Sequence, residues 1–160
     1  MSTYRFSFPT LIHFGAGTRK MVSDHLKASG VSRPLLVTDR GVAALPMFKE
    51  MMTHLSSGGL KPASFTEVWG NPVASQVTAG VDAFKSHDAD SIVGFGGGAA
   101  LDVAKAIALM ATHSGSIFDY EDEKPGARPI DGPIPYWIAL PTTSGTGSEV
   151  GRSTVVSDEQ

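Results

Sequence analysis

The 160-residue chain contains no cysteine, so it can form neither disulfide bonds nor thiolate metal sites. It has no cluster of Lys and Arg, and its formal net charge of −3 disfavours nucleic acid or an anionic membrane as a partner. Its longest apolar run, around residues 103–111, is too short to span a bilayer. We therefore expect a cytoplasmic protein that binds neither nucleic acid nor membrane.

The chain also has few residues that suggest a metal site or a catalytic base. Its five histidines are dispersed, and no two of them are four residues apart: His13, His25, His54, His87 and His113. No serine lies in a Gly-x-Ser-x-Gly pattern. We therefore assign no catalytic residue and no metal ligand to this chain.

Apolar runs that alternate with helical patterns dominate what is present. The runs predict strands over 35–38, 64–69, 91–93 and 136–140, and a further strand over 153–157. Helices are expected over 18–28, 45–55, 72–84 and 99–111, with Asn71 as a cap and Pro72 at the first helical position. Residues 118–135 are expected to form a solvated loop. This order predicts an α/β fold with a Rossmann-like parallel sheet flanked by helices.

The first of two glycine clusters, Gly94–Gly98, joins a predicted strand to a predicted helix. Bare backbone N–H groups at a helix N-terminus favour an anion, and the absence of side chains lets a phosphate approach closely. The spacing from Gly94 through Gly96 to Ala99 also satisfies the dinucleotide fingerprint. Gly96, Gly97, Gly98 and Ala99 are thus candidate phosphate contacts, although a plain connecting turn would have a similar sequence.

The second cluster, residues 141–149, follows the predicted strand over 136–140. It carries four hydroxyls that can donate to phosphate or ribose oxygens: Thr142, Thr143, Thr146 and Ser148. Ligands of open α/β sheets lie outside the carboxyl ends of the strands, where both clusters are expected. A turn is the alternative, because Ser, Thr and Gly favour turns.

Two carboxylates flank these loops. Asp39 ends a predicted strand, where it could accept both ribose hydroxyls of an adenosine and repel a 2′-phosphate, or merely terminate the strand. Asp102 lies in the first turn of the helix after the first cluster, where it would repel a phosphate. We expect Asp102 to pair with Lys105 at i+3 and to have a secondary role in shaping the loop.

Together the two clusters resemble a known family. Residues 96–105 (GGGAALDVAK) are similar to the GGGSxxDxAK motif of iron-dependent (group III) alcohol dehydrogenases, and residues 141–149 match that family's PTTxGTGSE motif throughout. Asp39 and Asn71-Pro72 fall where the family has a cofactor carboxylate and an Asn-Pro turn. One departure is Ala99, which replaces the usual serine, so the side-chain contact made by that serine is lost.

The resemblance implies that residues 1–160 form the N-terminal NAD(P)-binding domain of a dehydrogenase that transfers hydride between an alcohol or aldehyde and a nicotinamide. Pyrophosphate would lie on Gly97 and Gly98, Asn71 would line the cleft, and Asp39 would favour NAD over NADP. The family's metal, Fe2+ or Zn2+, is held by an aspartate and three histidines in a helical C-terminal domain. We expect that domain to be absent here, so the chain alone would be an inactive fragment, sticky or homo-oligomeric.

Three alternatives remain open from the sequence. A glycerol dehydrogenase or a dehydroquinate-synthase-like enzyme would share the fold. A nucleotide-binding module without chemistry would share the glycine loops and need no further domain.

Overall fold

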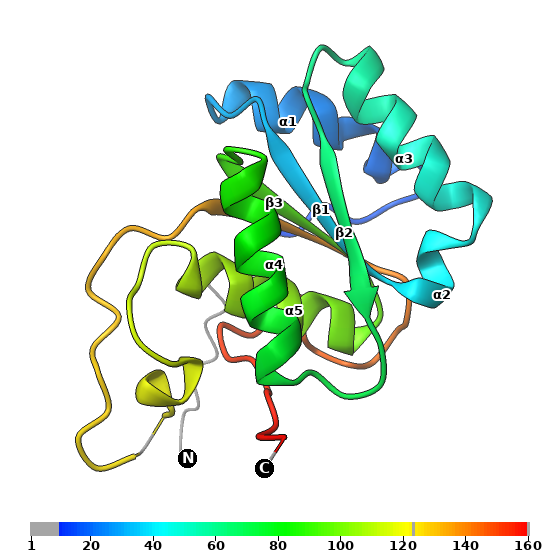
Figure 1. Ribbon diagram of the computed structural model, residues 1–160. Helices are drawn as coiled ribbons and strands as arrows, with labels where there is room; N and C mark the ends of the chain where they lie inside the picture. Colours follow the sequence, from blue (N-terminus) through cyan, green and yellow to red (C-terminus); the bar gives the residue numbers. More distant parts are fainter. Residues whose placement is uncertain (1–9, 123, 160) are drawn as a thin grey trace, which may run out of the picture.

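Four parallel strands form one sheet in the order β2-β1-β3-β4 (Figure 1). The computed structural model describes residues 10–122 and 124–159. The strands are β1 (Pro34–Asp39), β2 (Ala63–Val68), β3 (Ser91–Gly96) and β4 (Tyr136–Pro141). The predicted α/β fold with a Rossmann-like parallel sheet is therefore confirmed.

Helices cover both faces of this sheet (Figure 1). The elements are the 3-10 helices η1 (Thr18–Met21) and η2 (Ile117–Tyr120), and the α-helices α1 (Val22–Ala28), α2 (Arg40–Ala43), α3 (Pro46–Ser57), α4 (Ala74–Ser86) and α5 (Gly98–Met110). Apart from η2, the described residues between α5 and β4 form neither helix nor strand, as expected for a loop. Within the described ranges, no helix combines the length and the apolar character needed to cross a membrane.

Successive side chains of β1 and β3 point to opposite faces of the sheet and belong to two separate apolar cores. Leu35 and Val37 of β1 pack with residues of α4 and α5, whereas Leu36 packs with residues of α1 and α3. In β3, Ile92 and Val93 divide between the two cores in the same way. Because both faces of β1 and β3 are buried, these two strands have nearly continuous apolar sequences, which made them predictable from the sequence.

The glycine-rich strand β3 runs three residues beyond its predicted end at Val93. Gly94 and Gly96 still pair with β4, opposite Ala139 and Pro141. A Cβ on Gly94 would lie 3.0 Å from the Cβ of Ala104, so glycine lets α5 pack closely on the strand. The first glycine cluster therefore divides into a strand end and a turn.

The predicted start of the helix after Asn71 is wrong. Helix α4 begins at Ala74, and Val73 is its N-cap with φ −132° and ψ 158°. The backbone N–H of Ser157 donates to the carbonyl of Pro72 over 2.8 Å, and Val73 forms an isolated bridge with Ser157. These contacts keep residues 72–73 extended, so Asn71 does not cap the helix.

The predicted strand over 153–157 is also not formed, apart from that single bridge. The start of this segment instead contacts helix α5. The ammonium of Lys105 donates to the carbonyl of Ser153, and Thr154 Oγ1 donates to the carbonyl of Asp102 over 2.7 Å. The segment therefore crosses α5, and we call residues 151–157 the strap.

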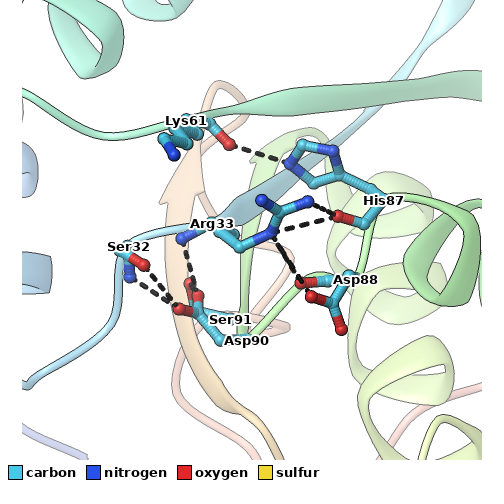
Figure 2. Close-up of polar contacts among 7 residues, drawn as sticks. All are labelled: Ser32, Arg33, Lys61, His87, Asp88, Asp90 and Ser91. Carbon is cyan, nitrogen blue, oxygen red and sulfur yellow. Dashed lines mark hydrogen bonds and ion pairs between the residues drawn. The ribbon is translucent and has the colours of Figure 1, made fainter.

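At the amino end of the sheet, Asp90 ties β1 to β3 (Figure 2). Its carboxylate accepts the backbone N–H of Ser32 over 2.7 Å, that of Arg33 over 2.9 Å and the hydroxyl of Ser91 over 2.9 Å. The guanidinium of Arg33 in turn donates to the carbonyls of His87 and Asp88. This cluster is structural and lies at the opposite end of the strands from the glycine loops.

Candidate functional site

The strand order places a topological switch between β1 and β3. The chain leaves β1 for β2 on one side and returns to build β3 on the other side. Crevices outside the carboxyl ends of strands at such a switch are where open α/β sheets bind ligands. Asp39 ends β1 and Gly96 ends β3, so both residues flank this position.

Asp39 has one oxygen engaged in the fold and one beside the glycine turn. Its Oδ1 accepts the backbone N–H of Val42 over 2.9 Å and so caps the four-residue helix α2. Its Oδ2 would lie 3.0 Å from a Cβ built on Gly96. A side chain at Gly96 would also meet the Cβ of Ala100 at 2.7 Å, so glycine is required for this close approach.

The two glycine clusters meet at one edge of the sheet, as predicted. The backbone N–H of Thr142 donates to the carbonyl of Gly96 over 2.9 Å. A Cβ on Gly97 would lie 3.3 Å from Thr143 Oγ1. A Cβ on Gly98 would lie 3.3 Å from Ser148 Oγ and 3.3 Å from the Cβ of Thr146. We call the bare backbone of residues 96–98, with the side chains of Thr142, Thr143, Thr146 and Ser148, the cradle.

The cradle opens onto the N-terminus of helix α5. Gly97 is the N-cap residue, with φ −75° and ψ −176°, and no side chain caps the helix there. The N-terminal amides and the positive end of the helix dipole favour an anion, and hydroxyls add further donors. The cradle thus fits a phosphate, to which Ala99 can offer its backbone N–H but no hydroxyl.

Asp102 makes structural contacts. Its carboxylate lies 3.0 Å from the ammonium of Lys105, which confirms the predicted i+3 pair. Lys105 also donates to the carbonyl of Ser153 and, over 3.5 Å, to that of Gly151. The sequence analysis missed this second function of Lys105, because its partners lie 46 and 48 residues away.

Beside Asp39 lies a group that the sequence analysis also missed. The Nε and Nη2 atoms of Arg40 donate to Oε2 of Glu67 over 3.2 and 2.5 Å. The guanidinium carbon of Arg40 lies 4.2 Å from the ring centroid of Trp69. No local pattern signals this contact, because the predicted strand over 64–69 included Trp69 and the structure ends β2 at Val68.

Asn71 lies in the turn that follows β2, and its side chain is exposed. The structure therefore leaves it at the carboxyl end of the sheet, on the side of β2, while the cradle lies at the ends of β3 and β4. Its predicted place along a cofactor cleft stays a prediction.

An open cleft of about 1950 Å³ lies beyond β4. Its lining includes Thr142 and Thr143 of the cradle, Glu149 and Lys105, but neither Asp39 nor Gly97. The cleft therefore adjoins the cradle at the loop after β4 and does not include the ends of β1 and β3.

The described residues do not supply a metal centre. Within residues 10–122 and 124–159, no group of three or more His, Asp or Glu side chains could hold a metal ion. His25, for example, has its Nε2 atom 2.6 Å from the hydroxyl of Tyr136. We therefore derive no chemical step through a metal from this chain.

Comparison with known proteins identifies the family. The family model described as iron-containing alcohol dehydrogenase matches residues 9–160. The chain belongs to the iron-containing alcohol dehydrogenase family. The resemblance of the two loop motifs is thereby confirmed.

Relatives within this family are longer than the chain. The choline dehydrogenase of Bacillus subtilis (strain 168) is 38% identical over 157 residues, which cover 98% of this chain and 39% of that protein. The NAD-dependent methanol dehydrogenase of Bacillus methanolicus is 35% identical over 153 residues, covering 96% and 39%. The crystal structure of a 1,3-propanediol oxidoreductase superposes with a TM-score of 0.88 at 30% identity, covering 99% and 40%. The chain thus spans about two fifths of the length of these relatives.

Proposed function

We propose that residues 1–160 are the NAD-binding domain of a metal-dependent alcohol dehydrogenase, which transfers hydride between an alcohol or aldehyde and a nicotinamide cofactor. The observation that carries this proposal is the meeting of Asp39, the bare backbone of residues 96–98 and the hydroxyl-rich loop at a topological switch. A methanol dehydrogenase that is NAD-dependent is among the family's members similar to this chain.

In this proposal each part of the site binds one part of the dinucleotide. The amides of Gly97 and Gly98 hold the pyrophosphate, assisted by the backbone of Ala99. The carboxylate of Asp39 accepts the adenosine ribose hydroxyls, and its charge repels a 2′-phosphate, so NAD is preferred to NADP. Asn71 lines the crevice, and Asp102 supports the loop through Lys105.

The hydroxyls of the cradle extend this binding toward the nicotinamide. Thr142, Thr143, Thr146 and Ser148 donate to phosphate and ribose oxygens. The cofactor, when bound, supplies the hydride chemistry, and this chain binds and orients it. A metal, Fe2+ or Zn2+, would be held by a helical domain outside residues 1–160.

We also propose that the protein works as a cytoplasmic homo-oligomer. Apolar side chains on the surface support association, since Phe14 is 98% and Leu11 74% exposed. Both residues line the cleft beyond β4.

Calorimetric titration of the protein carrying this chain with NAD+ and NADP+ tests the proposal. We expect NAD+ to bind more tightly than NADP+, and the metal-loaded protein to reduce NAD+ with a primary alcohol or diol. Failure to bind either dinucleotide would overturn the proposal. Tight binding of NAD+ without turnover of any alcohol or aldehyde would instead favour the nucleotide-binding module.

A further inference from the structure

We propose that Arg40 is a latent binding group for a 2′-phosphate, which Glu67 neutralises, so that Glu67 is a second determinant of cofactor choice beside Asp39. This inference rests on the proposed binding of a nicotinamide dinucleotide at Asp39. It concerns the side chains of Arg40, Glu67 and Trp69. These residues lie at the ends of β1 and β2, outside the two sequence motifs of the glycine loops.

The register of the sheet brings these side chains together. Asp39, the last residue of β1, pairs with Val68, the last residue of β2, and the residues that follow them, Arg40 and Trp69, are in contact. Helix α2, which Arg40 begins, lies near the carboxyl end of β2 (Figure 1). The buried Gln76 donates its Nε2 to the carbonyl of Trp69 over 2.7 Å and fixes the turn after β2.

Arg40 therefore directly follows the proposed ribose ligand Asp39, and its guanidinium lies on the β2 side, at Glu67 and Trp69. In dinucleotide-binding folds, an acidic residue at a strand end binds the ribose hydroxyls of NAD, whereas a nearby arginine accommodates the 2′-phosphate of NADP. Here the acidic residue and the arginine are consecutive. The charge of Asp39 opposes a phosphate, and the charge of Arg40 would attract it.

Glu67 opposes that attraction. It accepts two hydrogen bonds from Arg40 on one oxygen, Oε2, and the face of the Trp69 ring supports the guanidinium. The Arg40 and Glu67 side chains are 59% and 55% exposed, so their ion pair is weak and can be exchanged. A phosphate can take over a guanidinium through two parallel hydrogen bonds. Neutralising Glu67 would leave Arg40 free to do so.

The two carboxylates act at different points, so their removal has separable effects. Asp39→Asn removes the charge at the ribose and keeps the cap of α2, because asparagine caps as well as aspartate. Glu67→Gln leaves the ribose site unchanged and removes the negative charge that neutralises Arg40. In the Asp39→Asn background we expect Glu67→Gln to tighten NADP+ binding about tenfold, as a charge-assisted hydrogen bond would. NAD+ carries no 2′-phosphate, so its affinity should not change.

The experiment measures the dissociation constants of NAD+ and NADP+ by calorimetry in the protein carrying this chain. The variants are Asp39→Asn, Asp39→Asn with Glu67→Gln, and that double variant with Arg40→Met. Arg40→Met should cancel the gain in NADP+ affinity. Glu50→Gln in the Asp39→Asn background is the control for net charge, because Glu50 forms a similarly exposed ion pair with Arg19 at 3.2 Å.

The proposal is overturned if Glu67→Gln leaves NADP+ binding unchanged, if Arg40→Met fails to cancel the gain, or if Glu50→Gln produces an equal gain. NAD+ affinity in the double and triple variants equal to that of Asp39→Asn shows that these further substitutions leave the site folded. If the unaltered protein binds neither dinucleotide, the proposed function fails first, and this outcome is distinct from the others.

Discussion

The ammonium of Lys105 lies 3.0 Å from the carboxylate of Asp102, and the two side chains are only 6% and 13% exposed. Through this pair, helix α5 holds the strap that follows the second glycine cluster, because Lys105 also donates to the carbonyls of Gly151 and Ser153. The two loops that form the cradle are therefore fastened to the same helix.

Replacing Lys105 by methionine should strongly destabilise the protein. The substitution leaves the carboxylate of Asp102 nearly buried without its cation, which costs about 3–5 kcal/mol of unfolding free energy. Lys27→Met is the matched control, since Lys27 pairs with Asp24 at the same i,i+3 spacing but with side chains 46% and 84% exposed. Urea denaturation measures the unfolding free energy of both variants. A similar small loss of unfolding free energy in each would contradict the structural role of Lys105.

The hydrogen bonds of Asp90 make the unfolding free energy depend on pH. Burial raises the pKa of this carboxyl, but the hydrogen bonds from the backbone of Ser32 and Arg33 and from the hydroxyls of Ser91 and Ser32 outweigh it and hold the pKa below its usual value (Figure 2). A carboxylate with a lowered pKa stabilises the fold above the unfolded pKa, about 3.9, and this contribution is lost as the pH falls through the folded pKa.

Asp90→Asn should therefore lower the unfolding free energy at pH 7 by roughly 1.5–3 kcal/mol, the range for hydrogen bonds to a charged group. The difference from the unaltered protein should shrink below about pH 4. Asp88→Asn is the control, because Asp88 is 94% exposed and asparagine tolerates its positive φ of 54°. Equal losses in the two variants, or a difference that persists at low pH, would refute the assignment to Asp90.

Most of the sheet and the meeting of the glycine loops could be predicted from the sequence. Strands buried on both faces read as apolar runs, and the carboxyl ends of parallel strands meet at one edge. The contact between Thr142 and Gly96 follows from that rule.

The misplaced elements depend on contacts between distant parts of the chain. The pairing of Pro72 and Val73 with Ser157 moves the start of α4, and this contact is hidden from local patterns because Pro72 and Ser157 are far apart in the sequence. Helix α2 is four residues long and depends on the cap from Asp39, so it has no periodicity to detect. The Arg40–Glu67 pair joins residues 27 apart on neighbouring elements.

Alanine substitutions should separate the two parts of the first glycine cluster. Gly97→Ala places a methyl group 3.3 Å from Thr143 Oγ1, inside the cradle, at a φ of −75° that alanine adopts readily. We expect weaker NAD+ binding with little change in stability. Gly94→Ala instead meets Ala104 at 3.0 Å and Leu101 Cδ2 at 3.1 Å under α5, so it should lower stability by about 1–3 kcal/mol. Calorimetric titration measures the NAD+ affinity of the two variants, and thermal unfolding measures their stability. Unchanged NAD+ affinity in Gly97→Ala would show that the cradle does not bind the cofactor.

Asp39 has two functions, and two substitutions should separate them. Asn can still accept the N–H of Val42 and cap α2, whereas Asp39→Ala removes the cap and should cost about 1 kcal/mol of unfolding free energy. Neither residue offers the ribose a charged acceptor, so both variants should bind NAD+ about tenfold more weakly. Thermal unfolding and calorimetric titration of the two variants test this. If NAD+ affinity follows stability, so that only Asp39→Ala weakens binding, Asp39 is a helix cap and not a ligand of the ribose.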